Sequence, residues 1–161
     1  MPGSDVTVTQ ICAAVNETIG DALVASGVLA RTEDHDKLTE GIHDLPCLQV
    51  WPGSEGLVSS DSGAGETHKL TLGGPDQDHA IIEDIEIYVD FWAAVRHELA
   101  QDMAVLVAGI DSIRTIIKAQ DCPPFGLAGI RTFQWSWTAG STDYAGVTYL
   151  RARFTLMVNI F

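Results

Sequence analysis

Residues 81–92 read IIEDIEIYVDFW, and this alternation predicts a β-strand. Successive side chains of a β-strand point to opposite faces. The odd-numbered positions therefore form an apolar face that only Glu83 interrupts, while the even-numbered positions include three acids, Asp84, Glu86 and Asp90. A strand with one apolar face needs a second layer of structure to cover it.

Two amphipathic helices are predicted to supply that layer. The first runs from about Thr9 to Leu29, with a capping-box pair at Thr7 and Gln10 and a helix-ending Gly27. Its apolar stripe is Ile11, Val15, Ile19, Ala22 and Leu23. The second runs over about 98–119, and its apolar stripe is Leu99, Met103, Leu106, Ile110, Ile113 and Ile117. Both stripes have the spacing of a core-facing helix.

Short strands and connectors fill the first half of the chain around these helices. Strands are predicted over 45–51 and 67–72, and 31–44 is predicted to be a polar connector. Pro52 and Gly53 end the first of these strands. The loop at about 53–66 is rich in Gly and Ser, and we expect it to be mobile.

The last third of the chain predicts an extended C-terminal hairpin over 130–161. Its arms are 130–138 and 147–161, and its turn region is 139–146. The final arm is long for a strand. Two interpretations stay open: the arm pairs along its whole length inside the sheet, or it reaches a neighbouring molecule.

The predicted element order is α-β-β-β-α-β-β, which indicates a single α+β domain over 1–161. We expect a two-layer sandwich with a mostly antiparallel sheet and both helices packed on one face. The other face would carry Asp84, Glu86 and Asp90 on one strand and Arg151 and Arg153 on another. If these strands are neighbours, opposite charges lie across from each other.

The chain is strongly acidic, with 22 Asp and Glu against 9 Lys and Arg and a formal net charge of −13. This balance argues against a protein that tracks nucleic-acid phosphates. The acidity is greatest in the first half of the chain. It is interpreted either as a solubilising surface or as a surface that repels anions or attracts a basic partner.

Residue patterns for catalysis or metal binding are weak. Asp34, His35 and Asp36 are adjacent and lack a second ligand pair. The segment 63–69 lacks the spacing of a phosphate loop and precedes a strand. We therefore expect no catalytic, metal or cofactor site. One alternative remains, a small-ligand-binding or hydrolytic domain that uses Cys47 or Cys122 with a histidine.

Three cysteines without paired spacing indicate a reducing compartment. The first residues lack a signal-peptide pattern, and no apolar run is long enough for a membrane span. We expect synthesis in the cytosol and no membrane partner. Phe133, Trp135 and Trp137 alternate along one strand face. They are interpreted either as core packing or as an exposed binding platform.

The order of these features resembles the tail terminator, or tail completion, proteins of long-tailed bacteriophages and prophages. The resemblance covers nearly the whole chain. It rests on the element order, the long polar loop, the strand 81–92 leading into a long helix, and the terminal hairpin. It also rests on a short motif, which is Leu45, Pro46, Leu48, Val50, Pro52 and Gly53.

The resemblance implies a structural virion protein without enzymatic activity. Such proteins form a hexameric ring that caps the tail tube, ends its polymerisation and joins the head connector or neck. DNA later passes through the ring. The expected location is the tail or neck of the virion, after assembly in the cytoplasm of the bacterial host.

Within such a ring, two groups of residues are candidates for specific roles. The candidate protein-interface residues are Trp135, Trp137, Tyr149, Arg151, Arg153, Ser54, Glu55 and Glu66. The candidate pore-facing acids are Asp34, Asp36, Asp61 and Glu66. An acidic lumen would let DNA slide without binding. The main alternative within the same assembly is a head–tail joining or neck ring protein.

Overall fold

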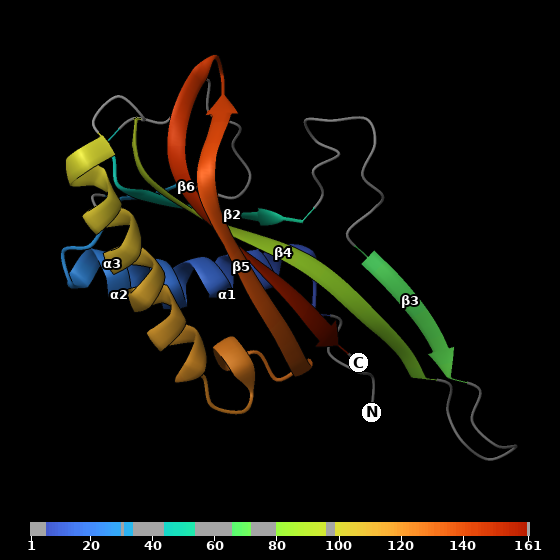
Figure 1. Ribbon diagram of the computed structural model, residues 1–161. Coiled ribbons are helices and arrows are strands. Elements are labelled where there is room, and N and C mark those ends of the chain that lie inside the picture. Colours follow the sequence, from blue (N-terminus) through green and yellow to red (C-terminus); the bar gives the residue numbers. More distant parts are fainter. Residues whose placement is uncertain are drawn as a thin grey trace, which may run out of the picture.

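The computed structural model describes residues 6–29, 31–33, 44–53, 66–71, 80–95 and 99–160 (Figure 1). The helices are α1 (Val8–Val15), α2 (Ala22–Ala25) and α3 (Leu99–Lys118). A π-helical stretch, Asn16–Asp21, joins α1 to α2, and a 3₁₀ turn, Pro124–Gly126, follows α3. The strands are β1 (Arg31–Glu33), β2 (Cys47–Pro52), β3 (Glu66–Thr71), β4 (Ala80–Val95), β5 (Ile130–Tyr144) and β6 (Val147–Ile160).

The strands form one six-stranded sheet in the order β1-β2-β4-β6-β5. Strand β3 pairs with β4 beyond the end of β2, so β2 and β3 occupy successive parts of one edge of β4. All pairs are antiparallel except β1 with β2. The expectation of a mostly antiparallel α+β fold is confirmed.

The helices cover a single face of this sheet (Figure 1). The main core lies between the layers, where Ile87, Val89 and Phe91 of β4 meet Ile113 of α3 and Ile11 of α1. All five side chains are fully buried. The odd-numbered residues of 81–92 whose side chains are described therefore face the core, as predicted.

The N-terminal helix begins as predicted but ends early. Thr7 caps it: Gln10 N donates to Thr7 Oγ1 at 3.2 Å, and Thr7 N donates to Gln10 Oε1 at 2.8 Å. The helical segment ends with α2 at Ala25 and not near Leu29. It ends there because Gly27 adopts the left-handed conformation, with φ +76, which stops a helix. Ala22 is exposed, so its assignment to the predicted apolar stripe is wrong. The π-helical stretch before it shifts which positions face the core.

Helix α3 packs on the core along most of its length. Leu106, Ile110, Ile113 and Ile117 are buried as predicted. Met103 is 49% exposed, so its assignment to the core stripe is wrong. The helix reaches the core only from Val105 onward in the part of the chain whose side chains are described.

Two further predictions need correction. Residues Arg31–Glu33, predicted within a connector, form the short parallel strand β1. The predicted turn over 139–146 is only two residues long, because β5 continues to Tyr144 and β6 starts at Val147. Ala145 and Gly146 have φ of +50 and +78, as a two-residue hairpin turn with the twist of the strands requires.

The long final arm, β6, pairs with β4 on one side and with β5 on the other. Of the two interpretations of its length, pairing inside the sheet is therefore confirmed. Strand β5 is the outermost strand on that side. Among the helices that the structure describes, none combines the length and apolar character needed to cross a membrane.

Candidate functional site

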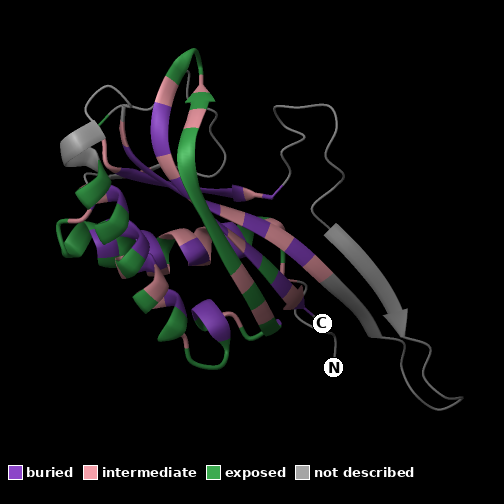
Figure 2. Ribbon diagram, viewed as in Figure 1, coloured by how far each residue is buried: buried purple, intermediate pink, exposed green. Residues whose placement is uncertain are grey.

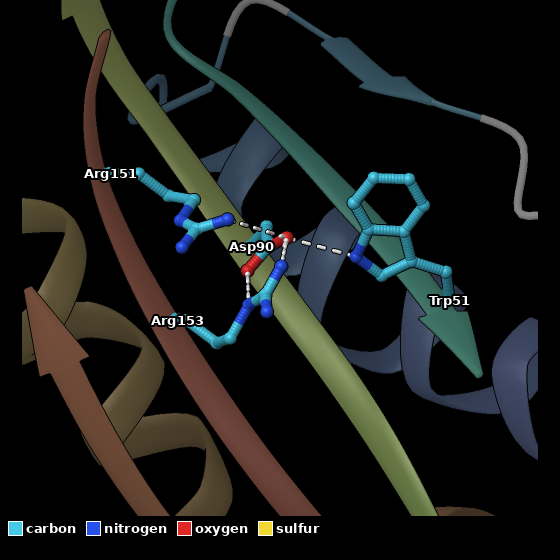
Figure 3. Close-up of polar contacts among 4 residues, drawn as sticks. All are labelled: Trp51, Asp90, Arg151 and Arg153. Carbon is cyan, nitrogen blue, oxygen red and sulfur yellow. Dashed lines mark hydrogen bonds and ion pairs between the residues drawn. The ribbon is translucent and has the colours of Figure 1, made fainter. Parts of the chain in front are cut away.

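A buried carboxylate lies at the centre of the sheet face that the helices leave open (Figure 3). Asp90 of β4 has no exposed surface. Arg153 of β6 donates to both of its oxygens, from Nε at 2.8 Å and from Nη2 at 2.9 Å. Trp51 of β2 donates from Nε1 at 2.9 Å, and Arg151 Nη1 lies 3.7 Å from the same carboxylate. We call these four residues the Asp90 cluster.

Strand register brings the Asp90 cluster together. Asp90 pairs directly with Arg153 across the antiparallel β4–β6 ladder, and Trp92 pairs with Arg151. On the other side of β4, Trp51 pairs with Tyr88, one position along the same face from Asp90. The sequence expectation that β4 acids lie across from Arg151 and Arg153 is confirmed for Asp90.

Aromatic rings surround the Asp90 cluster and form a second, smaller core. The rings of Trp92 and Tyr149 meet edge to face with centroids 5.5 Å apart, and Tyr144 packs on Trp92 at the same distance. The Arg151 guanidinium lies 5.4 Å from the Trp92 ring centroid, and that of Arg153 lies 4.1 Å from Tyr88. These cation–π contacts help to hold both arginines in place.

Two polar groups beside the Asp90 cluster are buried and have no hydrogen-bond partner among the residues that the structure describes. The Gln49 side chain is 1% exposed, and neither its amide oxygen nor its nitrogen makes a hydrogen bond to any of them. The indole Nε1 of Trp92 is also buried and donates no hydrogen bond to a described residue. Gln49 pairs with Asp90 across the β2–β4 ladder. Each unsatisfied buried group costs about 1–3 kcal/mol, so this face carries a local energetic penalty.

The chemistry of the Asp90 cluster is that of a charge-assisted structural contact. Its central carboxylate accepts three hydrogen bonds from donors that are held by strands on both sides. Such bidentate arginine–carboxylate pairs fix geometry strongly. The cluster therefore pins β2, β4 and β6 together on the open face of the sheet.

Asp90 was predicted on the sheet face away from the helices, whereas Trp51, Trp92 and Gln49 were not predicted as site residues. Alternation along β4 predicts which residues share a face, but it does not say which part of that face other side chains cover. The sequence did contain one signal: Asp90 is flanked at i−2 and i+2 by Tyr88 and Trp92. Large aromatic neighbours on the same strand face can exclude water from a small acid between them.

The candidate interface residues of the hairpin fall into two groups. Tyr149 is 3% exposed, and Arg151 and Arg153 belong to the Asp90 cluster, so all three are held within the chain. Trp135 and Trp137 lie on the helix-side face of β5, where both rings flank Phe154 with centroids 6.3 Å away. Trp137 remains 41% exposed and Trp135 is partly buried.

The remaining candidates lie outside the described residues. Ser54 and Glu55 do so, as do the acids Asp34, Asp36 and Asp61. The predicted mobile loop at about 53–66 is described only at its ends, Gly53 and Glu66. Glu66 begins β3, and only its backbone is described.

The cysteines of the enzyme alternative differ in their surroundings. Cys47 is fully buried beside Trp92, whereas Cys122 is exposed after α3. Cys12 lies in the main core, and burial raises the pKa of its thiol to about 12. Among the described residues, no group of three or more His, Cys, Asp or Glu side chains is placed to hold a metal ion.

Comparison with known protein families gives no matching family model, and a search of curated proteins gives no match either. The structure itself therefore defines the class of this protein, a two-layer α+β domain whose described helices cover one face of the sheet.

Proposed function

We propose that this chain is a tail terminator of a long-tailed bacteriophage or prophage. In this proposal, six copies form a ring that caps the tail tube and ends its polymerisation. The ring then presents a joining surface to the head connector. The protein acts as a structural part of the virion and catalyses no reaction.

The element order is the observation that carries the proposal. Helix α1, the strand β2 that ends in Pro52 and Gly53, the strand β4 leading into α3, and the β5–β6 hairpin follow one another as in the family that the sequence resembles. They build one domain with helices on a single sheet face. The order of these elements within one domain is the support for the proposal.

The distribution of charge supports a ring around DNA. Six copies at −13 each would carry −78. Arg151 and Arg153 are 21% and 13% exposed, and both contact Asp90. Two of the nine basic side chains are therefore engaged within the chain and contribute little to an exposed attractive surface. A mainly acidic lumen would repel DNA phosphates and let the duplex pass.

Elongation of purified tail tubes tests the proposal. Tube protein is polymerised with and without this chain, and tube lengths and ends are measured by electron microscopy. We expect shorter tubes with a ring-shaped density at one end. Unchanged tube lengths and bare tube ends would contradict the proposal. Binding to purified head connectors without any effect on tubes would instead identify a head–tail joining ring protein.

A further inference from the structure

The outer edge of β5 is open along an unusually long stretch. Strand β5 has 15 residues and ends the strand order, with β6 as its neighbour on the inner side. Most of its residues are exposed, including all of those from Ser136 to Ser141 in its middle (Figure 2). Among the described strands, none pairs with its outer edge.

This open edge lacks the devices that usually prevent strand pairing. Residues Thr132–Thr142 contain no Asp, Glu, Lys, Arg, His or Pro. Natural proteins generally protect an exposed edge with charges, prolines or bulges. The β5–β6 register is regular from Thr132 onward, so no bulge twists this edge away. The edge is therefore competent to receive another strand.

Charge favours a second copy of this chain as the occupant. Each copy carries a net charge of −13, so two copies repel each other overall. The stretch Thr132–Thr142 is an uncharged strip where two copies meet with the least repulsion. A strongly basic partner would gain nothing from this strip and would be drawn to the acidic surfaces instead.

The sizes of the side chains along Thr132–Thr142 also suit pairing of this strip with its own copy. Trp137, Trp135 and Phe133 share the helix-side face of β5, since they pair with the core residues Phe154, Leu156 and Val158 of β6. In an antiparallel pairing centred on Trp137, each Trp137 lies opposite its own copy. Trp135 then faces Ala139, and Phe133 faces Ser141, so these two rings each meet a small side chain, while the two Trp137 rings meet each other.

We infer that the free protein forms a twofold dimer in which the β5 edges of two copies pair antiparallel about Trp137. The pairing joins two six-stranded sheets into one. On the opposite face, the same register sets Ser136 against Thr138 and Thr132 against Thr142, without any pair of charges. The contact is isologous, which closes at two copies. The inference concerns the free protein and does not depend on tube capping.

Two double variants test both the edge and its register. Ser136 and Thr138 are exposed and lie opposite each other's copies in the proposed dimer. Ser136→Glu with Thr138→Glu puts like charges across the twofold axis, while Ser136→Lys with Thr138→Glu puts opposite charges there. The variants differ only in the sign at position 136. Analytical ultracentrifugation gives the dimer dissociation constant of each, and near-ultraviolet circular dichroism checks folding.

We expect the unaltered protein to be a dimer. The Glu/Glu variant should dissociate roughly tenfold more readily, and the Lys/Glu variant should remain close to the unaltered protein. A monomeric unaltered protein, or a Glu/Glu variant that dimerises as tightly, would overturn the inference. Equal weakening of both variants would overturn the twofold register. Tube capping is measured separately, so failure of the proposed function and failure of the dimer are distinguishable.

Discussion

At the scale of single residues, Asp90 is a buried carboxylate held by donors from two neighbouring strands. It is fully buried and accepts hydrogen bonds from Arg153 and Trp51. A buried ion pair is not by itself strong evidence of net stabilisation, because both charges lose their hydration. Removal of one partner is costly all the same, because it leaves the other charge uncompensated.

Asp90→Ala should therefore lower the free energy of unfolding by about 3–5 kcal/mol. Asp84→Ala is the matched control on the same strand face. Asp84 is partly buried and accepts one hydrogen bond, from Asn159 Nδ2 at 2.8 Å. We expect the control to cost about 1 kcal/mol. Urea unfolding measures both, and equal losses would show that the Asp90 cluster is not a strong contact.

The unpaired amide of Gln49 leads to a prediction of the opposite sign. Gln49→Leu removes a buried polar group without partners, so unfolding should require about 1 kcal/mol more free energy. Thr9→Leu, at an exposed position of α1 away from the β5 edge, is the control and should change stability by less than about 0.5 kcal/mol. A clear loss of stability in Gln49→Leu would mean that its amide does bind a partner.

At the scale of elements, the hairpin turn combines one suitable residue with one unfavourable residue. Gly146 adopts φ +78 at little cost, but Ala145 adopts φ +50, a region that residues with a Cβ rarely enter. The sequence Asn-Gly is preferred for such turns. The hairpin therefore forms in spite of its turn, because the β5–β6 ladder and the core behind it hold the strands together.

Ala145→Asn should raise the free energy of unfolding by roughly 0.5–1 kcal/mol, because asparagine tolerates the left-handed conformation. Thermal unfolding followed by circular dichroism measures the change. Ala128→Asn serves as the control, since Ala128 is exposed and is not among the residues with positive φ. If Ala145→Asn gives no gain over this control, the turn is not under conformational strain.

Element prediction succeeded where a single periodic pattern decided the outcome. The alternation in β4 and β6 and the helical spacing from Leu106 to Ile117 are confirmed by the buried positions. Strand β1 was missed because three residues, Arg31–Glu33, are too few to show a period. The hairpin turn was predicted too wide, since polar residues such as Ser141 and Asp143 occupy an exposed strand and not a loop.

The candidate site was less predictable than the fold. Register between strands distant in sequence places Trp51 and Arg153 on either side of Asp90. The sequence predicted the neighbouring charges of β4 and β6, but not that aromatic rings would bury them. Met103 shows the same limit for a helix, because spacing predicts a stripe and not where along the helix the core begins.

At the scale of the whole molecule, the proposed acidic lumen can be tested with lysines. In rings assembled on tubes, Asp34→Lys, Asp36→Lys and Asp61→Lys together should create salt-dependent DNA binding, because six copies would turn a repelling lumen into an attracting one. Retention of labelled DNA by capped tubes, measured over a range of salt concentrations, reports the change.

The charge-matched control for the lumen test uses three exposed acids elsewhere, Asp21→Lys, Asp111→Lys and Asp121→Lys. It changes the net charge by the same amount. Greater DNA retention by the first variant would place its acids at the lumen. Equal retention by both would show that net charge alone governs DNA binding, and the three proposed residues would then lose their assignment to the lumen.

The position of β6 has a consequence for how the protein is made. Among the described strands, β6 comes last in sequence, yet it lies inside the sheet between β4 and β5. During synthesis on a ribosome, the earlier strands emerge first. Strand β4 cannot pair fully with β6 until residues up to Ile160 have been synthesised. Contacts between such distant segments form slowly. Folding of the domain is therefore expected to follow its synthesis, and a message cut short within β6 would yield a chain unable to close its sheet.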